Sequence, residues 1–222
     1  MKKQTLEESV YETVRASIIS GALRPGAPLV EAQLSADMGI SKTPVREALI
    51  RLARDGLVVQ ELHRRSRVAT PTAEDVRAAC ELRRWVEGEI AANAAATASP
   101  ELIEALDASI ADSRRALKRR DAHAWAEAID AFTAALVNHS GNRYAGELLE
   151  RMRNILSLIA NISQEAPGRR ERSIDEHEAI ADAIRAGDPA AARAATFAHL
   201  ASIEDDSLGA LERFAAESAS AG

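Results

Sequence analysis

Two groups of residues in this 222-residue chain have types and spacings suited to chemistry. The first group is Lys42, Thr43 and Arg46, which come directly after the turn Gly39-Ile40-Ser41. If a helix begins there, its unpaired N–H groups and positive end favour a phosphate, and Arg46 can read a guanine through two parallel hydrogen bonds. The group therefore indicates contact with duplex DNA. The alternative for Arg46 is an ion pair with an acidic neighbour.

The second group is polar and lies in the C-terminal part of the chain: Arg83, Asn161, His177 and His199. The planar guanidinium of Arg83 suits a carboxylate, and the imidazoles of His177 and His199 can donate hydrogen bonds to an acidic ligand. Two alternatives stay open. Arg83 can pair with Glu87 one turn along a helix, and the two histidines can be buried packing residues.

The basic group needs a helix, and the apolar spacing predicts one that starts at Ser41 or Thr43 and ends near Asp55-Gly56. Its buried stripe has the spacing i, i+3, i+4, i+7 and consists of Val45, Ala48, Leu49 and Leu52. A first helix ends at Gly21, a short helix covers residues 31–38, and apolar runs at 57–62 and 67–69 flank a basic tip. This order predicts a winged helix-turn-helix over residues 1–72, with Arg64 and Arg65 in the wing.

The second group needs a helical framework. Residues 74–214 show helical periodicity with clear breaks, and the predicted helices cover residues 74–98, 101–119, 122–139, 143–165, 173–186 and 189–214. Ser173-Ile174-Asp175-Glu176 has the pattern of a capping box. Asn154, Ser157 and Asn161 form a polar stripe that either lines a cavity or faces solvent. The predicted fold class is mainly α, with an all-helical domain over residues 73–222.

Composition agrees with two small domains of different character. An aromatic content of only 3% in a chain that is 46% apolar favours long helices over a β-sandwich. The net charge of −6 is divided unevenly, because residues 1–72 hold 11 basic and 8 acidic side chains and the remainder holds 17 and 26. A basic module joined to an acidic one suits a DNA-binding unit attached to a regulatory unit.

Several function classes do not fit the sequence. It contains no Gly-rich phosphate loop, no Gly-x-Ser-x-Gly and no His-Glu-x-x-His, so we do not expect an enzyme. No apolar run approaches the length of a membrane span, and no leader with a long apolar stretch is present. The single cysteine, Cys80, cannot form an internal disulfide. These features predict a cytoplasmic protein that does not contact a membrane.

The N-terminal motifs resemble those of the GntR-type bacterial transcription regulators. The matching segments are Val10-Tyr11-Glu12, Arg24-Pro25-Gly26, Gly39-Ile40-Ser41-Lys42-Thr43-Pro44-Val45-Arg46 and Leu52-Ala53-Arg54-Asp55-Gly56. This resemblance implies that Lys42, Thr43 and Arg46 contact DNA and that Arg64 and Arg65 lie in the wing. Arginine is common in the family where this chain has Ala32 and Lys42, and the usual wing glycine is missing. The operator sequence therefore does not follow from the resemblance.

The C-terminal motifs resemble the all-helical FCD domain of the FadR-like subgroup. The matching segments are Glu81-Leu82-Arg83, Ser140-Gly141-Asn142, Glu176-His177-Glu178-Ala179-Ile180 and His199-Leu200. The resemblance implies that residues 73–222 are an effector-binding and dimerisation domain, which binds a small metabolite, often a carboxylate. It also implies a homodimer on near-palindromic double-stranded DNA. We therefore expect a ligand-responsive repressor that an organic acid releases from its operator.

Many members of that subgroup also hold a divalent metal through one Asp and three His. His177 and His199 match two of these ligands, so a regulator that binds Zn²⁺, Ni²⁺ or Mn²⁺ through them is the alternative function. The other two ligand positions carry Ile129 and Thr133. Asp130 lies roughly 100° further around the helix, so we expect it to point away from the site. We therefore expect no tightly held metal, because a tight site usually needs three or more protein ligands.

Overall fold

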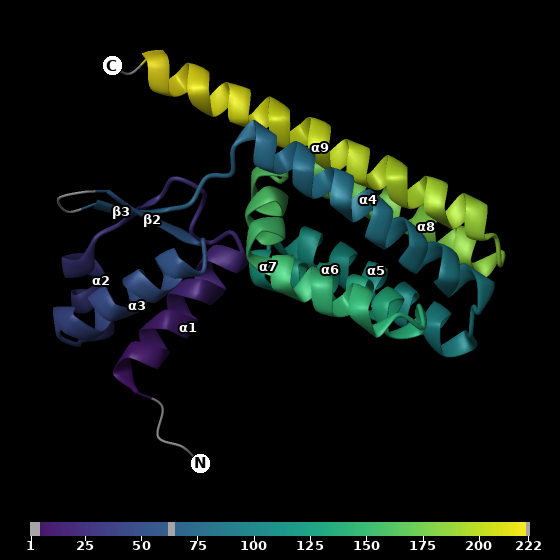
Figure 1. Cartoon of the computed structure of the whole chain (residues 1–222), viewed down its shortest axis with the longest axis horizontal. Coiled ribbons are helices and arrows are strands. Elements are labelled where there is room, and N and C mark those ends of the chain that lie inside the picture. The colour runs from purple at the N-terminus through teal and green to yellow at the C-terminus, as the bar shows by residue number, and fades with distance from the viewer. Residues whose placement is uncertain (1–4, 62–64, 221–222) are drawn as a thin grey trace.

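The computed structural model describes residues 5–61 and 65–220 and places a small N-terminal unit beside a long helical bundle (Figure 1). The N-terminal unit contains α1 (Leu6–Ile19), β1 (Pro28–Leu29), α2 (Glu31–Met38), α3 (Lys42–Arg54), β2 (Val58–Glu61) and β3 (Arg65–Val68). The bundle contains α4 (Ala73–Ala96), α5 (Pro100–Arg119), α6 (Ala122–His139), α7 (Arg143–Ser163), α8 (Arg169–Arg185) and α9 (Pro189–Ser220). The predicted fold class, a winged helix-turn-helix followed by an all-helical bundle, is confirmed.

The N-terminal unit is held together by the predicted stripe of α3. Its four members are fully buried and share a core with α1 and with the strands: Val45, Ala48, Leu49, Leu52. The strands form an antiparallel sheet in the order β1-β3-β2, in which Val58 pairs with Val68 and Glu61 with Arg65. The two-residue strand β1 was not predicted; it pairs Pro28 with Arg67 and so fixes the loop after α1 to the wing.

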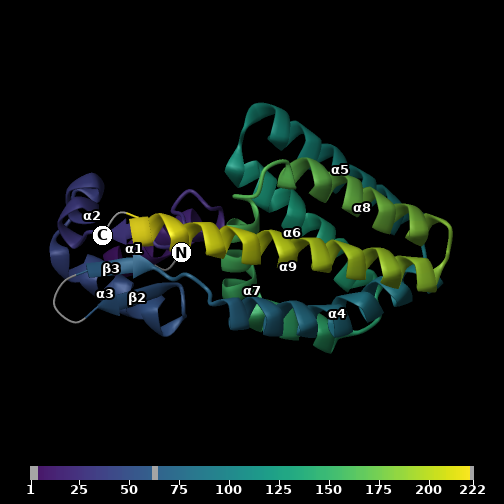
Figure 2. The ribbon, with the colours of Figure 1, turned by 90° about the horizontal axis from the view of Figure 1, so that it is seen from above.

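The bundle is built around α9, which packs along both α4 and α8 (Figure 2). A capping box starts α4, because Thr72 Oγ1 accepts a hydrogen bond from Asp75 N at 3.1 Å and the Asp75 carboxylate accepts one from Thr72 N at 2.8 Å. The capping box predicted at Ser173 is wrong. Gly168, with φ of +68°, turns the chain so that α8 already begins at Arg169, and Ser173 lies inside the helix.

Helix α7 connects the bundle to the N-terminal unit, beside which it runs in Figure 1. Leu158 of α7 is buried in the core of the N-terminal unit. Asn154 Nδ2 donates to the carbonyl oxygen of Asp55 at 2.9 Å, and Arg24 lies 3.4 Å from the carboxylate of Glu165. The two units therefore share apolar, hydrogen-bonded and ionic contacts. Within the described part of the chain, no helix is both long and apolar enough to cross a membrane.

Candidate functional site

The start of α3 is an exposed surface of polar and cationic side chains. Lys42, Thr43 and Arg46 are exposed, whereas Val45 between them is buried, so the helix turns its polar face outward. Ser41 occupies the N-cap position, but its side chain makes no capping hydrogen bond. The first N–H groups of α3 thus lack a side-chain partner, which suits a helix start that receives a phosphate.

Arg46 forms an ion pair with Glu31 at the start of α2. Arg46 Nε lies 3.1 Å from Glu31 Oε1, and Nη2 lies 2.9 Å from Oε2. The hydrogen bond and the charge of Glu31 raise the pKa of Arg46. The ion pair named as the alternative for Arg46 is therefore present. It leaves the Arg46 side chain 64% exposed, so the pair holds the guanidinium at the surface.

The wing is described only in part. Arg65 is the first residue of β3, opposite Glu61 of β2. Arg64 lies outside the described residues, between the two strands. The position of Arg65 on the strand agrees with a wing, whereas the contacts expected for Arg64 and Arg65 stay predictions.

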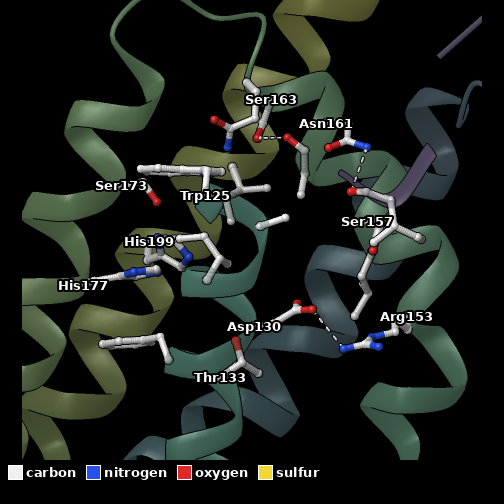
Figure 3. Close-up of a pocket in the computed structure, with 18 of the residues that line it drawn as sticks. Trp125, Asp130, Thr133, Arg153, Ser157, Asn161, Ser163, Ser173, His177 and His199 are labelled. Atoms are coloured by element: carbon white, nitrogen blue, oxygen red, sulfur yellow. Dashed lines mark hydrogen bonds and ion pairs between the residues drawn. The ribbon is translucent and has the colours of Figure 1, made fainter. Parts of the chain in front are cut away.

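A cavity of about 610 Å³ opens between α4, α6, α7, α8, α9 and the loop after α1 (Figure 3). It brings together all four polar residues that the sequence singled out: Arg83, Asn161, His177 and His199. Trp125, Ser173 and the two histidines lie on one side in Figure 3, and Ser157, Asn161 and Arg153 lie on the other. Gly21 and Arg24 also line the cavity, so its wall includes part of the N-terminal unit.

The two histidines are buried next to each other. The ring of His177 stacks on Phe132 with 4.1 Å between centroids, and His199 lies next to it at 4.8 Å. Burial lowers the pKa of His177 well below 6.5, and the nearby His199 adds to the effect. Burial also lowers the pKa of His199, although a hydrogen bond to Glu176 opposes this. His177 and His199 are thus buried at a helix contact, which was one of the two interpretations of the sequence. They also line a cavity.

Glu176, whose role in the site the sequence did not indicate, fixes the orientation of His199. His199 Nδ1 lies 2.6 Å from Glu176 Oε2, so a neutral imidazole donates its Nδ1–H to the carboxylate and keeps a free lone pair on Nε2. Arg169, whose side chain is 1% exposed, binds the same carboxylate with both terminal nitrogens, at 2.9 and 2.6 Å. Burial raises the pKa of Glu176, but the hydrogen bonds from His199 and Arg169 outweigh it and bring the pKa to about 2.

Arg83 lines the cavity with its guanidinium already occupied. Nε and Nη2 of Arg83 donate to the carboxylate of Glu87 at 2.6 and 3.3 Å. The side chains are 12% and 15% exposed, so the pair lies in the interior and not on the helix surface. Burial opposes the charge of Arg83, yet the Glu87 carboxylate raises its pKa. The i, i+4 pairing that the sequence left open is present.

The polar stripe of α7, formed by Asn154, Ser157 and Asn161, was predicted either to line a cavity or to face solvent. Neither interpretation describes it alone. Asn161 Nδ2 donates to the carbonyl oxygen of Ile18 at 2.7 Å, so this residue contacts the N-terminal unit while lining the cavity. Asn154 also binds the N-terminal unit, and Ser157 lines the cavity between them. The stripe therefore serves as a contact surface between the units at one edge of the cavity.

The residues of the cavity do not fit a divalent metal. Ile129 and Thr133 line it at the positions where the family has an aspartate and a histidine. Asp130, expected to point away, does reach the cavity wall, but its carboxylate pairs with Arg153 at 3.0 Å on the side opposite the histidines (Figure 3). In residues 5–61 and 65–220, no three His, Cys, Asp or Glu side chains converge on one point.

Comparisons with known proteins match both parts of the chain. Residues 6–69 match the profile described as bacterial regulatory proteins, gntR family, and residues 78–202 match the FCD domain. The chain is 33% identical to an HTH-type transcriptional regulator from an unstable DNA locus of Streptomyces ambofaciens, over 97% of this chain and 89% of the relative. It is 26% identical to the HTH-type transcriptional repressor RspR of Escherichia coli K12, over 91% and 89% of the two chains.

A solved structure extends the likeness to three dimensions. A GntR transcriptional regulator from Rhodococcus sp. RHA1 superposes with a TM-score of 0.74 at 28% identity, over 91% of this chain and 97% of that one. The superposition covers the N-terminal unit and the bundle together. The fold and the order of the two units are thus those of a known class of DNA-binding proteins.

Proposed function

Because the chain belongs to the GntR family of bacterial transcription regulators and carries an FCD domain, we propose that it is a ligand-responsive repressor. It acts in the cytoplasm as a homodimer, binds near-palindromic double-stranded DNA and is released by an organic acid. The observation that carries the proposal is the cavity that α7 and the loop after α1 share. A ligand there contacts the bundle and the N-terminal unit at once.

In this proposal, residues 1–72 bind the operator. The first turn of α3 enters the major groove, where Lys42 and Thr43 contact phosphate and Arg46 reads a base. Arg64 and Arg65 of the wing contact the adjacent backbone or groove. The exposure of the α3 start and the absence of a side-chain cap on it support this role.

Residues 73–222 sense the effector in the same proposal. His177 and His199 contribute neutral hydrogen-bonding groups, and Asn161 lies at the cavity edge next to Gly21. Arg83 contributes positive charge that Glu87 compensates, so it contacts the effector only if this pair rearranges. These assignments rest on the lining of the cavity and on the partners described above.

Dimerisation brings two α3 helices to two half-sites in this account. The bundle exposes two aromatic side chains on neighbouring helices, Trp85 of α4 at 64% and Phe197 of α9 at 38%. Helices α4 and α9 lie side by side (Figure 2), so these residues supply apolar surface for a second copy. An effector then acts by favouring one spacing of the two DNA-binding units, which requires different affinities for the two arrangements.

The test is a selection of bound fragments from the genomic DNA of the source organism. The purified protein should enrich fragments that share a near-palindrome, with half-sites about 34 Å apart or a multiple of that distance. Trp85→Glu should reduce both dimer formation and enrichment. Recovery of unrelated fragments would contradict the proposal.

A further inference from the structure

The arginines of the cavity differ in whether a carboxylate already neutralises them. Of the described residues, six arginines line the cavity. Four are paired with a carboxylate: Arg24 with Glu165, Arg83 with Glu87, Arg153 with Asp130 and Arg169 with Glu176. Arg120 is exposed at the end of α5. The remaining one, Arg170, is partly buried, and no carboxylate of the described residues lies within 4 Å of its guanidinium.

Neutral groups hold Arg170 in place. Its Nε donates to Gln164 Oε1 at 3.0 Å, and its guanidinium lies 5.4 Å from the centre of the Trp125 ring. In the described part of the chain, neither terminal nitrogen of Arg170 has a hydrogen-bond partner. Burial lowers the pKa of Arg170, which Glu171 and Glu165 oppose, and an arginine stays charged in proteins. The two terminal nitrogens thus form an oriented cationic fork without an anion.

The neighbouring Arg169 shows how different two adjacent arginines can be. Arg169 binds Glu176 through both terminal nitrogens and donates to Ser202 at 2.6 Å. Its positive charge is therefore compensated inside the protein, and its function is to hold Glu176 and thereby His199. Arg170 has no such partner in residues 5–61 and 65–220.

Further unpaired polar groups lie on the same face of α8 as Arg170. Ser173 and His177 follow it at i+3 and i+7, and all three line the cavity. His177 is 4% exposed, and its ring nitrogens have no hydrogen-bond partner among the described residues. The Ser173 hydroxyl, on a residue that is also 4% exposed, has none either. Among the described residues, the buried side-chain nitrogen or oxygen without a partner is Arg169 Nε, so the polar atoms of Ser173 and His177 are open to the cavity and available to a polar ligand there.

We propose that Arg170, and not Arg83, binds the acidic group of the effector. The group is a carboxylate or a phosphate, because both match the planar fork of an arginine. Ser173 and His177 then face the polar remainder of the same molecule. This inference rests on the proposed function, since it takes the cavity as the effector site.

Trp125 provides the readout for a direct test. The chain has two tryptophans, and Trp85→Phe leaves Trp125, beside Arg170, as the only one. In this background, acetate and inorganic phosphate are titrated at constant ionic strength, with chloride as the reference ion. We expect a saturable change in Trp125 emission for at least one of the two anions, and the anion that gives it identifies the acidic group.

Three variants locate the response. Arg170→Gln should weaken anion binding at least about tenfold, the loss expected for a hydrogen bond to a charged group. Arg170→Lys, which keeps the charge but loses the fork, should weaken it less. Arg185→Gln, at the other end of α8 and paired with Asp107, should leave it unchanged. Thermal unfolding of each variant establishes that it is folded, and Arg170→Lys carries the test if Arg170→Gln is not.

Two results overturn the inference: no saturable response to either anion, or an unchanged response in Arg170→Gln. The same proteins are assayed for operator binding, which separates the inference from the proposed function. Intact operator binding with a negative anion titration removes only the role of Arg170. Loss of operator preference removes the proposed function whatever the titration gives.

Discussion

Asn161 of α7 donates a hydrogen bond from Nδ2 to the carbonyl oxygen of Ile18, 2.7 Å away near the end of α1. Gly21 follows closely in a left-handed conformation, with φ of +77°, and a Cβ atom there would lie 3.0 Å from Asn161 Oδ1. The chain therefore turns tightly against Asn161. One side chain at the edge of the cavity thus holds the end of the first helix of the N-terminal unit.

Asn161→Ala should uncouple the effector from DNA binding. It removes the hydrogen bond between the units, so effector binding should shift operator affinity by less than in the wild-type protein, where a coupling of about 1–3 kcal/mol is typical. Operator affinity is measured by fluorescence anisotropy with and without effector. Asn93→Ala, an exposed position on α4 away from the contact, is the control and should leave the coupling intact. If the effector shifts operator affinity equally in Asn161→Ala and Asn93→Ala, Asn161 does not couple effector binding to DNA binding.

Arg46→Ala should lower operator affinity by about 1–3 kcal/mol and relax sequence preference at one base pair. The reason is that Arg46 is the exposed arginine of the α3 start, and its planar fork can form two parallel hydrogen bonds with a base. Lys42→Ala is the matched comparison and should weaken binding evenly across sequences while reducing the salt dependence. Binding to a set of single-base operator variants distinguishes the two. A uniform loss in Arg46→Ala would make Arg46 a phosphate contact.

Glu31→Gln should strengthen DNA binding. Glu31 holds Arg46 in an exposed ion pair, so the guanidinium must leave Glu31 before it can bind a base. Exposed ion pairs are weak, so the gain in affinity should not exceed roughly fivefold. The double variant Glu31→Gln/Arg46→Ala should show no gain over Arg46→Ala alone. A gain in the double variant would mean that the negative charge of Glu31 repels DNA directly and that Glu31 does not act through Arg46.

The protein should lose stability on acidification in two steps. Burial keeps the pKa of His177 and His199 below 6.5, so the unfolded chain binds protons that the folded chain excludes. The free energy of unfolding should therefore fall by up to about 1.4 kcal/mol per pH unit for each histidine as the pH drops below 6.5. Glu176 has a pKa of about 2 in the folded protein, so its contribution is present above pH 4.5 and is lost between pH 4.5 and about 2.

Urea unfolding at a series of pH values measures these steps. His177→Gln should flatten the fall below pH 6.5, because one excluded protonation is removed. Identical profiles for wild type and His177→Gln would show that His177 takes up its proton equally in both states.

The sequence was sufficient for the fold because each element carries a local signal. The α3 stripe of Val45, Ala48, Leu49 and Leu52 has helical spacing and is fully buried. The capping-box pattern at Ser173 predicted the wrong start for α8. The helix begins directly after Gly168, because the left-handed conformation of this glycine turns the chain there. Local patterns can compete, and tertiary packing selects between them.

The site was predictable only in part, because residue type does not reveal burial. His177 and His199 were found through their chemistry, whereas Glu176, Arg169 and Arg170 were not. Arg169 is buried because Ser202 and Asp206 of α9, more than thirty residues away in sequence, lie against it. The sequence of residue types along α8 does not distinguish Arg169 from Arg170. The partners of Asn161 likewise depend on how two units meet.

The most direct test of the account is the ratio of affinities for a selected operator and for a shuffled duplex of the same composition, measured by anisotropy over a range of salt concentrations. A regulator that reads bases through α3 should bind the operator about a thousandfold more tightly or better, and the preference should persist as salt rises. Equal binding to both duplexes, falling together with salt, would contradict sequence reading by α3 and would leave the protein as a nonspecific DNA-binding protein.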